Sequence, residues 1–239
     1  MQFPHESFHN HSQHHNSELT MKQSHPVNHE ISDVSRETYN AVLSEYEKNR
    51  DAYSELIGIW LQWNQSVNLF SKRTDQSLLR NHIFHSLFLV IETMISDAAS
   101  AETIIDAGTG GGLPGLPMAI ACPDKHFILV DKVAKKTMAV KDIIRSLGIA
   151  NVRVANQDIE SVEATTPARV VSKHAFHVSN LLKALQGKNI QEISMLKGDD
   201  VLSEININIV NANRITLKRF NIQENPFFQN KYIIHLHQR

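Results

Sequence analysis

The chain has 239 residues, of which 41% are hydrophobic, so it is long and apolar enough for one large domain with a substantial core. A formal net charge of −1 gives no overall attraction to nucleic acid, so any RNA-binding surface must be local. The single cysteine, Cys122, excludes an internal disulfide and favours a reducing compartment. No apolar run approaches the ~18 residues of a membrane span, and the first residues lack the apolar core of a signal peptide, so we expect a cytoplasmic protein without membrane contact.

Residues 1–34 have the composition of a disordered leader. Seven of the fourteen histidines lie in the first 30 residues, among asparagine, serine and glutamine. The few apolar side chains there cannot offset the entropy that is lost when a segment becomes ordered. Histidine-rich tracts can bind metal ions, but the spacing is irregular and no cysteine joins the histidines, so we predict no metal site.

An N-terminal helical cap is expected over residues 35–98. Helices are predicted from about residue 35, over about 50–64 and over about 75–97. In the first of them, apolar side chains recur at i, i+3, i+4 and i+7, namely Tyr39, Val42, Leu43 and Tyr46. We expect these helices to pack on the rest of the chain.

The remaining residues, 99–239, are expected to form the second and larger domain, in which short β-branched runs alternate with helical segments. Strands are predicted at 103–108, 126–131, 151–156, 168–173, 192–198, 214–220 and 231–237. A helix is expected after the first strand, with Pro114 and Pro117 in its first turn. A helix after the second strand ends at Gly148, and another is expected over about 178–186. This alternation predicts an α/β fold with a mostly parallel, Rossmann-like sheet. Because no helix separates the last two strands, the last strand should be antiparallel.

A glycine-rich stretch, IIDAGTGGGLPGLP at residues 104–117, follows the first predicted strand. Ligands of open parallel sheets bind beyond the carboxyl ends of the strands. Glycine there permits positive φ and lets a ligand approach the backbone closely. Gly110, Gly112 and Gly115 match the dinucleotide pattern G-x-G-x-x-G, which keeps a nicotinamide-dependent oxidoreductase as an alternative.

The charges around this stretch favour a different ligand. Asp106 stands two positions before the first glycine, and a carboxylate there would repel a pyrophosphate. S-adenosylmethionine carries a sulfonium and an ammonium and no phosphate. Asp131 closes the second predicted strand, where a carboxylate can hold the hydroxyls of a ribose. We therefore predict S-adenosylmethionine as the cofactor, bound by Asp106, Gly108, Gly110, Gly112 and Asp131.

The stretch IIDAGTGGGLPGLPMAIACPDKHFILVDKVAKK, residues 104–136, resembles the glucose-inhibited division protein B family, because ordinary methyltransferases lack its two prolines. VVSK at 170–173, MLKG at 195–198 and PFFQNKYIIHLH at 226–237 also resemble family landmarks, and the resemblance covers about residues 35–239. Family members are bacterial enzymes that use S-adenosylmethionine to form 7-methylguanosine in small-subunit (16S) ribosomal RNA. The resemblance implies this activity in a monomeric enzyme, with an assembling or complete 30S particle as its partner. It makes residues 99–239 the methyltransferase domain.

By position, the resemblance also implies particular cofactor contacts. Gly108 and Leu113 would touch the cofactor from the glycine loop, and Ile159 and Glu160 would flank its adenine. Lys173 takes the place of a family arginine near the cofactor and the RNA. It keeps the charge but lacks the planar fork that suits phosphate.

Two further departures from the family pattern lie near Lys173 or in the predicted cap. His85 stands where the family has an acid, and His174 is an additional residue. These departures leave open a relative that binds the cofactor without turnover. The neutral net charge leaves open a methyltransferase for a small molecule or a protein.

The chemistry of N7 methylation requires little from the protein beyond alignment. Guanine N7 exposes a lone pair, so no general base is expected, and alignment can supply roughly 7–11 kcal/mol of the barrier. Because N7 lies in the deep groove of A-form RNA, the target should lie in a loop or a distorted region. Local basic clusters can hold RNA phosphates, and we expect RNA contacts from Arg73, His82, Lys136 and Lys173.

Overall fold

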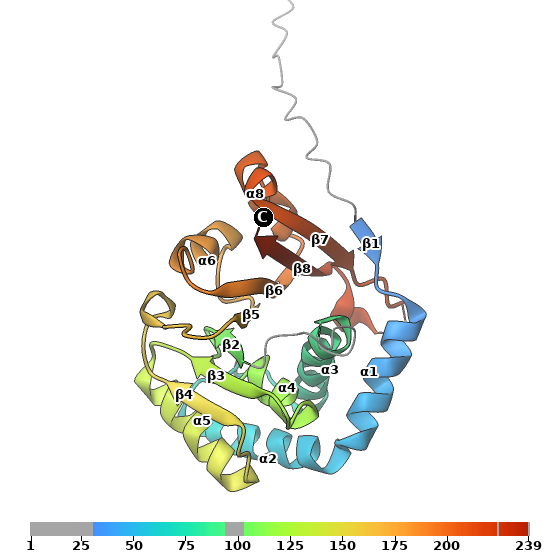
Figure 1. The fold of residues 1–239 in the computed structure, drawn as a ribbon. Helices are drawn as coiled ribbons and strands as arrows, with labels where there is room; N and C mark the ends of the chain where they lie inside the picture. The colour runs from blue at the N-terminus through green and yellow to red at the C-terminus, as the bar shows by residue number, and fades with distance from the viewer. Residues whose placement is uncertain (1–30, 94–102, 224, 239) are drawn as a thin grey trace, which may run out of the picture.

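The computed structural model describes residues 31–93, 103–223 and 225–238, and these residues form an eight-stranded mixed sheet with helices on both faces (Figure 1). The strand order is β1-β7-β8-β6-β5-β2-β3-β4. The strands are β1 (Ile31–Asp33), β2 (Thr103–Ala107), β3 (His126–Val130), β4 (Val152–Ala155), β5 (Ala168–Lys173), β6 (Ile190–Gly198), β7 (Asn213–Arg219) and β8 (Lys231–Gln238).

The directions of the strands confirm the predicted fold class. Among the described strands, β8 alone runs antiparallel to its neighbours β6 and β7, and every other pair is parallel. The chain passes from β2 outward to β3 and β4 and then returns to β5 on the other side of β2. The carboxyl ends of β2, β3 and β5 therefore meet at the place where the direction of winding reverses, which is where open sheets bind their ligands.

The helices include those predicted and two that were not. They are α1 (Arg36–Lys48), α2 (Arg50–Ser66), α3 (Gln76–Thr93), α4 (Gly115–Ala121), α5 (Ala134–Leu147), α6 (Val178–Ala184), α7 (Val201–Glu204) and α8 (Ile207–Ala212). Short 3₁₀ turns lie at Ile159–Ser161 and Pro226–Phe228. The short helices α7 and α8 were not predicted. The part of the third predicted helix that follows Thr93 lies outside the described residues.

The prediction of a disordered leader over residues 1–34 is wrong at its end. Residues 1–30 lie outside the described residues, but Ile31–Asp33 forms strand β1, which pairs with β7 at the edge of the sheet. Arg219 donates hydrogen bonds to Asp33 and holds this edge. A three-residue strand has too little periodicity to be found without its partner.

The three N-terminal helices share one hydrophobic core with one face of the sheet. Apolar side chains of α1, α2 and α3 pack in the same cluster as those of α4 and α5, and Trp60 at its centre is fully buried. A second cluster contains side chains of α6, α7 and α8 on the other face. The expected cap is thus an integral layer of the molecule. Over the described residues, no helix has the length and apolarity to cross a membrane.

Helix α5 ends at Gly148, as predicted, and Gly148 adopts a left-handed conformation with φ +63°. Its N–H and that of Ile149 bond back to carbonyls in the last turn of the helix, which is the usual C-terminal cap. A side chain at this position would be strained.

We predict that Gly148→Ala lowers the free energy of unfolding by about 1 kcal/mol, because a left-handed alanine is strained. Gly58→Ala is the matched control. Gly58 lies inside α2, and a Cβ added there meets no described atom within 4 Å, so alanine should stabilise the helix by about 1 kcal/mol. Urea denaturation measures both changes, and equal signs for the two variants would contradict the assignment of the helix end.

Candidate functional site

A cavity of about 420 Å³ opens at the carboxyl ends of β2, β3 and β5. Its walls come from four segments: the glycine loop after β2, the turn into α5, the residues after β4 and the segment after β5. This volume lies in the range of small-molecule and cofactor sites, roughly 300–1,000 Å³.

The glycine loop presents bare backbone to this cavity. Gly110 has φ +57°, and a Cβ added there would meet no described atom within 4 Å, so its open side is the side that lines the cavity. The neighbouring glycines are needed for close packing. A Cβ at Gly108 would lie 2.6 Å from Cβ of Ala175, and one at Gly111 would lie 2.7 Å from Cζ of Phe70. The loop therefore combines an open position with positions that only glycine fits.

Asp106 fixes this loop from below. Its carboxylate is fully buried, and Oδ2 accepts hydrogen bonds from Thr109 Oγ1 at 2.6 Å and from the N–H of Gly115 at 2.8 Å. Burial raises the pKa of Asp106 to about 7, although the two hydrogen bonds oppose this change. Its Oδ1 has no hydrogen-bond partner among the described residues. We expected Asp106 to meet the ligand, but its carboxylate does not line the cavity and instead joins the two ends of the loop.

Asp131 lies on the wall of the cavity, at the end of β3 as predicted. Its Oδ2 accepts a hydrogen bond from the N–H of Gly110 at 2.9 Å, and Oδ1 accepts one from Val133 at 2.8 Å. One carboxylate thus connects the glycine loop with the turn into α5.

Helix α2 also braces the glycine loop, which the sequence did not predict. The indole N–H of Trp60 donates a hydrogen bond of 2.7 Å to the carbonyl of Gly111, and the Tyr53 hydroxyl donates one of 3.1 Å to the carbonyl of Pro117. Both side chains are buried, and buried indole and phenol groups need such partners. No local pattern indicates this contact, because the partner lies 51 residues further on.

Lys173, at the end of β5, lines the cavity and contacts His82 of α3. The Lys173 ammonium donates to Nδ1 of His82 over 3.0 Å. Burial, followed by the charge of Lys173, lowers the pKa of His82 to about 3, so this imidazole is neutral and can accept the bond. Burial and the nearby Lys231 lower the pKa of Lys173 to about 7, while the attraction of Asp106 opposes this change.

His85, which stands where the resemblance predicts an acid, lies in the core and not in the cavity. It is fully buried, and neither ring nitrogen has a hydrogen-bond partner among the described residues. The rings of Phe220 and Phe227 meet it edge-on, with centroids at 5.0 and 5.8 Å. Burial holds its pKa well below the usual value, so His85 is a neutral member of an aromatic cluster.

The cavity brings together six of the predicted site residues and leaves others outside its wall. Its wall includes Gly108, Gly110, Asp131, Lys136, Ile159 and Lys173. The predicted contacts Gly112, Leu113 and Glu160 do not line it, and neither do Arg73 and His82. Gly112 and Leu113 are buried in the turn into α4, and Glu160 points outward. We expected Lys136 to contact RNA, but it lies on the wall of the cavity.

Several wall residues were not predicted, chiefly Gln157 and Asp158 after β4 and Ala175 and Phe176 after β5. The rule that parallel strands end at one edge could have found Gln157 and Asp158, since the third strand had been recognised. Ala175 and Phe176 depend on the course of a loop, for which the sequence carries no comparable signal.

The sheet order, the single reversed strand beside the end of the parallel series and the glycine loop at the reversal of winding define a Rossmann-like domain of the methyltransferase class. A family model described as rRNA small subunit methyltransferase G matches residues 49–232. The chain belongs to this family, which is also called GidB.

Relatives named ribosomal RNA small subunit methyltransferase G match much of the chain. The protein of Chlorobium phaeobacteroides is 38% identical over 142 residues, which cover 58% of this chain and 60% of the relative. That of Chlorobium limicola is 34% identical, covering 66% of this chain and 74% of the relative, and that of Christiangramia forsetii is 31% identical, covering 81% and 89%. The match to the first relative therefore spans less than two thirds of its length. Among solved structures, a precorrin-6y C5,15-methyltransferase of Geobacter metallireducens has a TM-score of 0.46 at 11% identity, covering 71% of this chain and 93% of that chain.

We predict that Gly110→Val weakens binding of S-adenosylmethionine roughly 100-fold, because the new side chain projects into the cavity. Gly187→Val is the matched control, since Gly187 also has positive φ and open space around it but lies away from the cavity. Both variants should lose about 1–2 kcal/mol of unfolding free energy through backbone strain. Calorimetric titration measures the affinity, and equal affinities for the two variants would exclude this cavity as the cofactor site.

The lowered pKa of Lys173 makes a second prediction. Between pH 7 and about 10.5 the unfolded chain holds the lysine proton while the folded chain releases it, so this group makes the protein more stable as the pH rises. Lys173→Met removes that contribution. The difference in unfolding free energy between wild type and variant, from urea denaturation, should therefore change in favour of wild type from pH 7 to pH 9.5. Parallel pH profiles would show that the lysine keeps its ordinary pKa.

Proposed function

We propose that the chain is an S-adenosylmethionine-dependent methyltransferase that methylates N7 of a guanine in 16S ribosomal RNA. The observation that carries the proposal is the cavity at the ends of β2 and β3, where the open face of Gly110 and the Asp131 carboxylate lie side by side in a chain of this family. We further propose that it acts as a monomer in the cytoplasm, on an assembling or complete 30S particle.

The residues of the cavity fit this cofactor. The bare backbone at Gly108 and Gly110 allows a ligand to lie against the loop, and Asp131 offers carboxylate oxygens for ribose hydroxyls. The apolar side chain of Ile159 suits one face of an adenine, while Lys173 can meet a carboxylate. An acid at the position of Asp131 would also suit the ribose of a nicotinamide dinucleotide, so it is membership of a methyltransferase family that argues against that alternative.

When bound, the cofactor supplies a methyl group activated by a sulfonium. The chain's own residues contribute position and charge. Asp106 and Asp131 hold the glycine loop rigid, so the backbone at Gly110 can fix the donor in one orientation. Lys173 lines the cavity while its ammonium contacts His82, and it can donate a further hydrogen bond to the guanine. Alignment of this kind accounts for roughly 7–11 kcal/mol without a general base.

A basic loop lies beside the glycine loop and suits an RNA backbone. The segment between α2 and α3 carries the exposed side chains of Lys72 and Arg73. In the same segment, Phe70 packs against Gly111, and Trp60 meets the Phe70 ring edge-on at 5.3 Å. Positive charge on this segment would hold phosphates close to the methyl donor.

The proposal is tested by incubating the protein with methyl-labelled S-adenosylmethionine and small subunits that lack the modification. Label should appear as 7-methylguanosine in 16S RNA, and Gly110→Val should abolish it. Label in protein or in small molecules, insensitive to ribonuclease, would instead establish another substrate class. Cofactor binding without any transfer would establish a binding protein.

Arg73→Glu is expected to raise the KM for subunits roughly tenfold at low salt, since it places a negative charge against RNA phosphates. Cofactor affinity should be unchanged, because Arg73 is exposed and does not line the cavity. Arg214→Glu is the control, an exposed arginine at the beginning of β7. Similar KM values for the two variants would show that this loop does not contact the RNA.

A further inference from the structure

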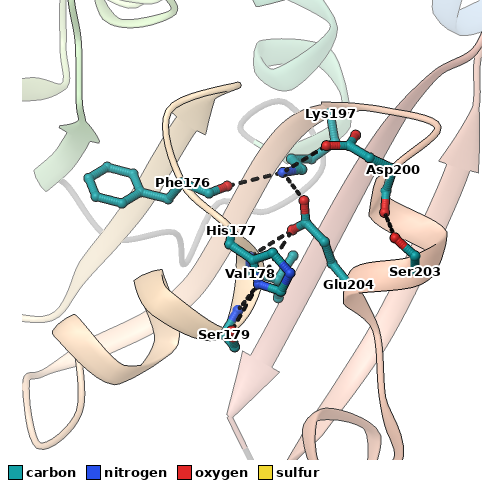
Figure 2. Close-up of polar contacts among 8 residues, drawn as sticks. All are labelled: Phe176, His177, Val178, Ser179, Lys197, Asp200, Ser203 and Glu204. Atoms are coloured by element: carbon teal, nitrogen blue, oxygen red, sulfur yellow. Dashed lines mark hydrogen bonds and ion pairs between the residues drawn. The ribbon is translucent and has the colours of Figure 1, made fainter.

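A buried ion pair outside the cavity joins the end of β6 to α7. The Lys197 ammonium lies 2.5 Å from Oε1 of Glu204, and both side chains are almost completely buried, with 5% and 6% exposed. Lys197 belongs to the MLKG segment at the end of β6, and Glu204 is the last residue of α7. Figure 2 shows the pair, with the exposed carboxylate of Asp200 beside Lys197 at 3.9 Å.

Each member of the pair also holds the segment after β5. The Lys197 ammonium donates a hydrogen bond of 3.0 Å to the carbonyl of Phe176, and Oε2 of Glu204 accepts one of 2.7 Å from the N–H of Val178. The lysine thus donates to the carbonyl of Phe176, and the glutamate accepts from the N–H two residues later in the same segment (Figure 2). The ring of Phe176 points away from the ion pair.

The segment held in this way forms part of the cofactor cavity. Ala175 and Phe176 line the cavity and also pack on the glycine loop, where a Cβ added at Gly108 would come within 2.6 Å of Ala175 and 3.0 Å of the Phe176 ring. The segment begins at His174, which has φ +53°, a conformation that is unfavourable for a residue with a side chain. Contacts elsewhere must therefore keep the segment in place.

We propose that Lys197 and Glu204 are positioning residues, whose ion pair clamps Phe176 against the glycine loop and so sets the shape of the cofactor cavity. The inference rests on the proposed function, since it takes this cavity as the cofactor site. Neither side chain lines the cavity, so each acts through the backbone of the 176–178 segment.

The burial of two charges is consistent with such a role. Removing two charges from water is costly, and replacing a buried pair with apolar residues of similar size is often neutral or stabilising. A pair kept only for stability would therefore have an apolar substitute. We call the ion pair and its two hydrogen bonds to Phe176 and Val178 the clamp. The clamp has no apolar substitute, because only charged or polar groups can bind both the Phe176 carbonyl and the Val178 N–H.

The test is the double variant Lys197→Met/Glu204→Leu, which removes the clamp while keeping an apolar contact. Its thermal midpoint should fall, because the Phe176 carbonyl and the Val178 N–H lose their partners, and its dissociation constant for S-adenosylmethionine should rise at least about tenfold. Wild-type affinity in a folded double variant would overturn the proposal. If Gly110→Val also left the affinity unchanged, the assignment of the cavity itself would fail.

A single substitution gives a second test, should the double variant not fold. Glu204→Gln weakens the clamp, and Glu192→Gln is the matched control, a buried carboxylate at the other end of β6 that pairs with Arg169 and His235. Both variants should lose stability, but only Glu204→Gln should weaken cofactor binding. Equal affinities for the two would overturn the proposal.

A double-mutant cycle shows whether the effect passes through Phe176. Phe176→Ala and Glu204→Gln should weaken cofactor binding together by much less than the product of their separate effects, because both release the same wall of the cavity. Phe176→Ala combined with Glu192→Gln should show no such coupling. Multiplicative effects in the first pair would show that the ion pair acts in another way.

Discussion

The hydrogen bonds of the Asp106 carboxylate are the contact on which the site depends. Oδ2 joins the hydroxyl of Thr109 to the N–H of Gly115, so a single oxygen closes the glycine loop at both ends. Gly115 has no space for a side chain, since an added Cβ would lie 2.6 Å from that same oxygen. The glycines of the loop and the buried acid therefore depend on each other, and together they determine the shape of the cavity.

Further layers hold the loop from three sides. Asp131 reaches it from β3, Trp60 from α2, and the segment after β5 packs on Gly108. A flexible glycine-rich segment would lose much conformational entropy on binding a ligand. Because these contacts already order the loop in the folded protein, that entropy is lost on folding and not on binding. Such preorganisation suits a reaction that needs alignment more than acid–base chemistry.

Much of the fold could be predicted because its signals are local. The strands from β2 to β5 differ from their predicted bounds by at most one residue at either end, since each is a β-branched run between turn residues. Strand β1 pairs with β7, and the ion pair of Lys197 and Glu204 holds a segment 21 to 26 residues away, and no local pattern specifies such partners. Asp106 shows the limit most clearly: its position near the loop was evident, but whether it faced the ligand or the loop depended on the return of the chain to Gly115. The pairing of Lys173 with His82 likewise joins residues 91 positions apart.

The hydrogen bond of the Trp60 indole has a consequence for how the chain folds. Its N–H is bound to the Gly111 carbonyl, so a piece of the chain beginning after α3 would present that buried acceptor without its donor. The same piece would expose the apolar side chains that now pack beneath α1, α2 and α3. The three N-terminal helices therefore complete their core only with the strands and the loop that follow them in the sequence, and we expect the two parts to fold as one unit.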